Sequence, residues 1–148
     1  VLFRSMVGDG PHFWAAPFEE GEEFGGLGQP AHVTVEDRAM RIKGLRLTAT
    51  TIGAVVTDCA LSKPELHRLS IAAHDGLARA VLPAHLPSDG DTMLTASTGR
   101  RARSSQADLM ELCHLATLVT ARAIARGVFE AVALPYADAQ PAWRDKWG

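Results

Sequence analysis

Cysteine is scarce in this sequence, and so are side-chain arrangements that bind metals. Only two cysteines, Cys59 and Cys113, occur among the 148 residues, and neither has a second Cys or His at metal-ligand spacing. Cys113 and His114 are neighbours, so on a helix they would point about 100° apart, which suits one metal ion poorly. The sequence therefore predicts no metal site, no disulfide framework and a reduced, cytoplasmic protein.

An excess of charge of one sign is also lacking. A formal net charge of −2 gives no reason to expect nucleic acid or an anionic membrane as a partner. The basic residues Arg100, Arg101 and Arg103 cluster without interleaved aromatic residues, which is typical of a solvated loop. No signal peptide, membrane-spanning stretch or internal repeat is visible, and a content of 47% hydrophobic and 22% charged residues is ordinary for one globular domain.

The first five residues do not resemble the start of a natural protein. Residues 1–5 precede Met6 and match the translation of a common sequencing-adapter end, so we interpret them as a scar on a fragment and exclude them from the fold. The alternative is that they continue a native strand that begins further upstream. On either interpretation, an N-terminal portion of the protein is expected to be missing.

Residues 6–49 are predicted to be mostly loop. Aromatic residues between turn residues, as in Phe13-Trp14 and Phe24-Gly25-Gly26, indicate an ordered loop that packs on something. A β-branched run predicts a short strand over residues 31–36. The charged segment over residues 37–46 is expected to be exposed, where a processing cut would be reachable.

From residue 50 onward the predicted order is β-α-β-α. The apolar run of the first strand is nearly continuous, which indicates burial on both faces. Both helices begin with a capping residue, and the first has a complete capping box in Ser62-Lys63-Pro64-Glu65. The fold class is therefore α/β, with helices on one side of a sheet. The predicted elements are a strand over residues 50–57, a helix from Ser62 to about residue 81, a strand over residues 91–98, a basic loop over residues 99–104 and a helix from Ser105 to about residue 132.

Thr50 and Thr51 stand at the head of the first strand. A threonine hydroxyl becomes a usable nucleophile when a base lies beside it, and the amine of an N-terminal residue can be that base. The unperturbed pKa of such an amine, roughly 8, leaves a useful neutral fraction near neutral pH. Threonines also begin strands because they are β-branched, so composition alone favours the structural role.

Two further polar segments are candidates for chemistry. In Asp89-Gly90-Asp91-Thr92, two carboxylates flank a glycine and could orient a hydroxyl and an ammonium, although a turn with a capping Asp is the commoner meaning. His74-Asp75-Gly76 suggests a general base, but adjacent helical residues do not face each other, so a packed histidine is the commoner outcome. Gly76 in mid-helix indicates a close backbone contact. His67 shares a helix face with His74, without an acid or Cys at matching spacing.

Four segments occur in an order and spacing that are specific, although each segment alone is a weak signal. Together they resemble the self-cleaving aminopeptidase family that includes L-aminopeptidase/D-esterase (DmpA), the β-peptidyl aminopeptidases and the nylon-oligomer hydrolase. The resemblance covers nearly everything from Met6 to about Leu134. The four segments are the loop over residues 12–26, residues 50–58, residues 73–80 and residues 89–92.

The resemblance implies an N-terminal-nucleophile-type hydrolase. A precursor would cut itself between Ala49 and Thr50, and Thr50 would then be the nucleophile, supported by Asp89 and Asp91. It also implies a four-layer αββα sandwich, no metal or cofactor, a small peptide, amide or ester substrate, and a homo-oligomer of αβ units. In this division, residues 6–49 are the end of the α chain with its linker, and residues 50–148 are the β chain.

Two departures from the family pattern limit this interpretation. The first is that Ala49 stands where the family usually has Asn or Gly. Ala-Thr is also the cleavage pair of the ornithine acetyltransferases, which share the fold and an Asp-Gly-Asp-Thr motif. An acyltransferase and a non-catalytic domain of the same fold are therefore the alternatives.

The second departure is a missing residue: the family's oxyanion-stabilising Asn lies upstream, and nothing in residues 6–49 can be assigned to it. Because one such donor is commonly worth about a hundredfold in rate, the 148-residue chain alone is predicted to be inactive.

Overall fold

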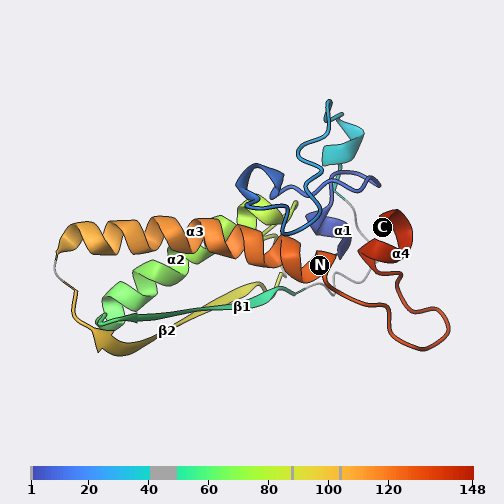
Figure 1. The fold of residues 1–148 in the computed structure, drawn as a ribbon. Helices are drawn as coiled ribbons and strands as arrows, with labels where there is room; N and C mark the ends of the chain where they lie inside the picture. The colour runs from blue at the N-terminus through green and yellow to red at the C-terminus, as the bar shows by residue number, and fades with distance from the viewer. Residues whose placement is uncertain (1, 41–49, 88, 104) are drawn as a thin grey trace.

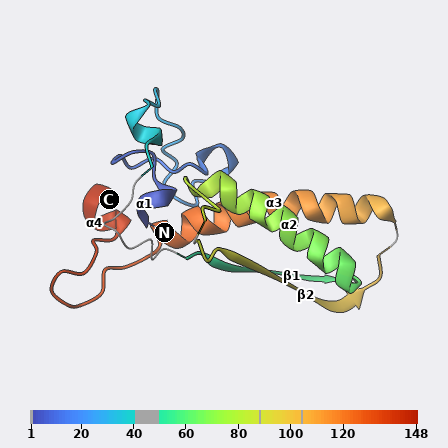
Figure 2. The ribbon, with the colours of Figure 1, turned by 180° about the vertical axis from the view of Figure 1, so that it is seen from behind.

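Two long helices cover one side of a two-stranded sheet (Figure 1). The computed structural model describes residues 2–40, 50–87, 89–103 and 105–148. Viewed from behind in Figure 2, the other face of the sheet carries no layer from these residues. The elements are α1 (Leu2–Ser5), η1 (Ala16–Phe18), η2 (Glu36–Arg38), β1 (Ile52–Cys59), α2 (Lys63–Ala80), β2 (Thr92–Arg101), α3 (Gln106–Phe129) and α4 (Trp143–Trp147). From β1 to α3 the elements follow the predicted order β-α-β-α.

The two strands run parallel, with Ile52 of β1 opposite Thr92 of β2. Parallel neighbours need a crossover connection, and α2 supplies it. Side chains of β1 alternate between the helix-covered face and the open face, where Ile52 and Val56 are 73% and 66% exposed. The expected burial on both faces is therefore wrong within the described residues, because nothing among them packs against the second face.

Strand β2 extends to Arg101, so the predicted basic loop over residues 99–104 begins later than expected. The pairing continues past an irregularity between Thr57 and Cys59, and the N–H of Ala60 donates to the carbonyl oxygen of Arg101 at 2.7 Å. Continued pairing with β1 thus overrides the loop signal of the arginine cluster.

Both long helices start at the capping residues found in the sequence. The N–H of Ser62 donates to the Glu65 carboxylate at 2.8 Å, and the N–H of Asp108 donates to the Ser105 hydroxyl at 3.3 Å. Helix α3 ends at Phe129, short of the predicted residue 132. The apolar pattern continues to Val132, but this side chain is 83% exposed and has no core to join.

The N-terminal loop packs against the C-terminal end of the chain, as an aromatic-rich ordered loop should. Phe13 and Phe24 are buried with ring centroids 5.4 Å apart, and Phe13 stacks on Trp143 of α4 at 6.0 Å. The indole N–H of Trp143 donates to the Pro11 carbonyl at 3.0 Å. In Figures 1 and 2, the N-terminal loop and α4 both lie near the C-terminal end of α3.

The predicted strand over residues 31–36 is wrong. The N–H and hydroxyl of Thr34 both donate to the Asp37 carboxylate, at 2.9 and 3.0 Å, and the turn leads into η2. These local side-chain bonds compete with strand pairing. Val35, which suggested a strand, is exposed.

Helix α3 is also long and apolar enough, by length and composition alone, to cross a membrane. Core helices of folded domains pass the same test. Here α3 packs along α2, and α3 residues such as Ala116, Ala121 and Ala125 are buried.

The helix contact is closest at Gly76, as its mid-helix position predicts. A Cβ added there would clash with the Thr117 carbonyl oxygen and lie 2.8 Å from the Thr120 Cβ. Nearby, the hydroxyl of Thr117 donates to the Ala72 carbonyl of α2 at 2.9 Å. The two backbones can approach this closely only because residue 76 has no side chain.

Gly76→Ala should lower the free energy of unfolding by about 1–3 kcal/mol, because overpacking at this contact outweighs the gain in helix propensity of about 1 kcal/mol. Urea unfolding followed by circular dichroism measures this change. Gly127→Ala in α3 is the matched control, since an added Cβ meets nothing within 4 Å. An equal effect of the two substitutions would contradict the close-contact explanation.

Candidate functional site

Thr50 lies two residues before Ile52, the first residue of β1, with its side chain against the loop that leads into β2. A Cβ on Gly90 would lie 2.7 Å from the Thr50 hydroxyl oxygen, so this close approach depends on glycine. Parallel strands have their amino ends at the same edge of the sheet, which is why residues before β1 and before β2 meet here. The structure therefore places Thr50 beside the segment that carries both predicted carboxylates.

Asp91 ties this segment to the head of β1. Its Oδ1 accepts the N–H of Thr51 at 2.7 Å, and the N–H of Thr92 donates to the Thr51 carbonyl at 2.9 Å. Asp89 Oδ2 accepts the N–H of Leu86 at 3.3 Å, which closes the preceding loop. The two carboxylates thus also have structural partners, as expected for a turn with capping aspartates.

Arg4 of α1 is the cation that faces the acidic pair. Its Nη1 lies 2.8 Å from Asp89 Oδ2 and its Nη2 lies 3.5 Å from Asp91 Oδ1. The side chains of Arg4, Asp89 and Asp91 are only 5%, 9% and 1% exposed, so one guanidinium faces two carboxylates largely out of water. Arg4 belongs to the five residues interpreted as a scar. That interpretation stays a prediction; in this chain Arg4 pairs with both of the predicted carboxylates.

Ala49, the predicted residue before the cut, lies outside the described residues. Cys59 and Cys113 are free thiols. Within the described part of the chain, no group of three His, Cys, Asp or Glu side chains is placed to hold a metal ion.

His74 of α2 faces His85, with ring centroids 4.9 Å apart. Burial lowers the pKa of His74 below its ordinary value of 6.5, and nearby His85 lowers it further, whereas Asp91 and Asp75 act in the opposite direction. His85 had no signal in the sequence, because its place depends on the loop conformation after α2.

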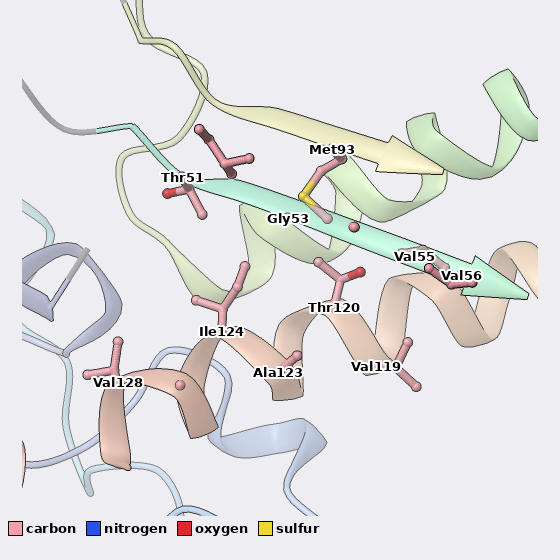
Figure 3. Close-up of a pocket in the computed structure, with 13 residues that line it drawn as sticks. Thr51, Gly53, Val55, Val56, Met93, Val119, Thr120, Ala123, Ile124 and Val128 are labelled. Atoms are coloured by element: carbon pink, nitrogen blue, oxygen red, sulfur yellow. The ribbon is translucent and has the colours of Figure 1, made fainter. Parts of the chain in front are cut away.

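An apolar groove of about 530 Å³ runs between β1 and α3 (Figure 3). Thr51, one residue after the candidate nucleophile, lines it. Val119, Thr120, Ala123 and Ile124 form its α3 side. The groove contains none of the predicted catalytic residues.

Comparison with known proteins places the chain among peptidases. The sequence profile of peptidase family S58 matches residues 16–141, a range that includes Thr50, Asp89 and Asp91, and the chain belongs to this family. Proteins named as uncharacterized aminopeptidases in Mycobacterium bovis and Mycobacterium tuberculosis are each 44% identical over 105 residues, which is 65% of this chain and 30% of each relative. One from Mycobacterium leprae is 47% identical over 60 residues, 40% of this chain and 17% of that relative. The matched region therefore spans less than a third of the length of these relatives.

Arg4→Met should destabilise the 148-residue chain by about 3–5 kcal/mol, because it leaves two buried carboxylates without their counter-charge. Urea unfolding at neutral pH measures the loss. Arg101→Met is the control, since Arg101 and Asp58 form an exposed pair at 3.9 Å that is worth at most about 1 kcal/mol. Equal effects of the two substitutions would mean that Arg4 is not the counter-charge of the acidic pair.

The stability of the chain should fall as the pH drops below the ordinary His74 pKa of 6.5. The folded state holds the pKa of His74 below that value, so below it the unfolded state binds more protons, and stability is lost until the pH reaches the folded pKa. His74→Gln should flatten this part of the curve, measured by urea unfolding from about pH 8 to about pH 5. His67→Gln, at an exposed position of the same helix, should leave the slope in place, and a slope that survives His74→Gln would contradict the assignment.

Proposed function

We propose that this chain is the nucleophile-bearing part of a self-cleaving hydrolase, with Thr50 as its nucleophile. The observation that carries the proposal is the position of the Thr50 hydroxyl against Gly90, the residue that separates Asp89 from Asp91 in the sequence. Membership of a peptidase family supports hydrolysis as the reaction class and favours it over the acetyltransferase alternative. The aminopeptidase names of the relatives suggest a small peptide, amide or ester as substrate.

In the proposed maturation step, the Thr50 hydroxyl attacks the carbonyl carbon of Ala49. The C–N bond to Thr50 breaks, its nitrogen takes up the hydroxyl proton, and Ala49 becomes esterified to the Thr50 oxygen. Water then hydrolyses the ester and frees a chain that begins with Thr50. The hydrogen bond from Thr51 to Asp91 holds the residue next to the reacting group, which limits the motion of the nucleophile.

In the proposed turnover step, the new amine of Thr50 acts as the base for its own hydroxyl. The hydroxyl oxygen attacks the substrate carbonyl, an acyl-enzyme forms, and the leaving amine or alcohol takes up the proton. Water then releases the acyl group by the same route. Asp89 and Asp91 would stabilise the ammonium form of the amine, provided that another cation does not occupy them.

Two features of this chain support the expectation that it is inactive by itself. Arg4 already pairs with both carboxylates. The sheet also leaves Ile52, Val56 and Leu94 exposed on its open face. A second sheet packed on this open face, together with the sheet described here, would form the two inner layers of a four-layer αββα sandwich. We propose that the remainder of a longer precursor supplies that second sheet.

We further propose that the mature protein is a cytoplasmic homo-oligomer of αβ units.

Thr50→Ala in the full-length precursor should abolish both the cut and the hydrolysis of amino-acid p-nitroanilides. Thr50→Ser, which keeps a hydroxyl at the same place, should still give two chains. Intact-mass spectrometry of the purified proteins measures the cut, with the unaltered precursor expected to yield a chain that starts at residue 50.

A cut that persists in the Thr50→Ala variant would refute the assignment of the nucleophile. An unaltered precursor that stays whole and inactive would instead support a non-catalytic domain of the same fold.

A further inference from the structure

Helix α3 packs mainly against α2, and its contact with β1 is slight. The side chains of Val119, Ala123 and Val128 line the α3 side of the groove, opposite β1 (Figure 3). Ala123 and Gly127 are small, which leaves room for a backbone beneath this part of the helix.

The edge of β1 at this groove has free backbone groups. Within the described ranges, β1 pairs with β2 alone. The N–H and carbonyl of Thr51 both point toward the β2 side, so the alternate residues Ile52, Ala54 and Val56 direct theirs to the opposite edge. An eight-residue strand with an apolar, unprotected edge is a template for another strand.

A buried hydroxyl in the groove also needs a partner. Thr120 is 4% exposed, and its Oγ1 has no hydrogen-bond partner among the described residues. Buried polar groups in native proteins are almost always hydrogen-bonded. A polypeptide segment beneath α3 could supply the missing donor or acceptor.

We propose that this groove holds a β-strand from the part of the full-length polypeptide outside residues 1–148, paired with the free edge of β1 and packed beneath α3. The matched region covers only 30% of the length of the aminopeptidase relatives, so enough chain exists in such proteins to provide the strand. The strand should carry apolar side chains at alternate positions, because the α3 side of the groove is apolar. This inference concerns assembly and does not depend on Thr50 being a nucleophile.

Residue-specific amide exchange, compared between the 148-residue chain and the full-length gene product, tests the proposal. The amides of Ile52, Ala54 and Val56 should exchange on the order of 100-fold more slowly in the full-length protein. The amides of Gly53 and Val55, on the β2 side, should be protected in both. Equal exchange of the edge amides in the two proteins would overturn the proposal, as would protection in the short chain that rises with its concentration, which indicates a second copy in the groove.

A matched pair of variants separates the groove from the rest of the surface. Ala123 in the groove and Ala78 on α2 are both exposed helical alanines. In the full-length protein, Ala123→Arg should remove the protection of the edge amides, while Ala78→Arg should retain it. Both variants of the 148-residue chain should unfold at the temperature of the unaltered chain, and equal protection in the two full-length variants would contradict the proposal.

The uncut Thr50→Ala precursor distinguishes this proposal from the proposed chemistry. It should keep the edge amides protected although it cannot cleave itself. Loss of protection in that variant would show that the groove is filled only after cleavage, and the assembly proposed here would be wrong.

Discussion

The hydrogen bond from the Thr51 N–H to the Asp91 carboxylate is the interaction on which the candidate site depends. It joins the first residues of β1 to the loop before β2, and so brings Thr50 against Gly90. The crossover through α2 makes the two strands parallel and places their amino ends together. Without this parallel pairing, residues some forty positions apart in the sequence would not meet.

The same carboxylate also takes part in a buried charge cluster. Asp91 shares Arg4 with Asp89, and these charges are stable away from water only while they remain paired. In a chain cut before Thr50, a new ammonium would compete for these partners. The cation opposite the acidic pair therefore links the fold of the amino-terminal residues to the chemistry proposed for Thr50.

Much of the fold could be predicted because its signals are local. The Ser62 box and the Ser105 cap determine where the helices begin, and Gly76 marks the place where α2 and α3 touch. The predictions fail where contacts between residues far apart in the sequence determine the secondary structure. β-branched residues did not make residues 31–36 a strand, since Thr34 and Asp37 close a turn and none of the described strands pairs with this segment.

The candidate site was predictable only in part, for the same reason. Spacing and resemblance pointed to Thr50, Asp89 and Asp91, but no local pattern places Arg4 beside the two carboxylates or His85 against His74. The apolar sequence of β1 also predicted burial on both faces, which the described residues do not provide. The apolar residues on the exposed face of β1 mark a surface where we propose that more of the polypeptide packs.

The most direct measurement of the central claim is to locate the acyl group during turnover. The mature full-length protein would be mixed with an amino-acid ester, quenched in acid, digested and analysed by mass spectrometry. The account predicts an acyl group on the peptide that begins at residue 50, attached to the Thr50 side-chain oxygen. An acyl group on Cys59 or Cys113, or turnover without any acylated peptide, would contradict it.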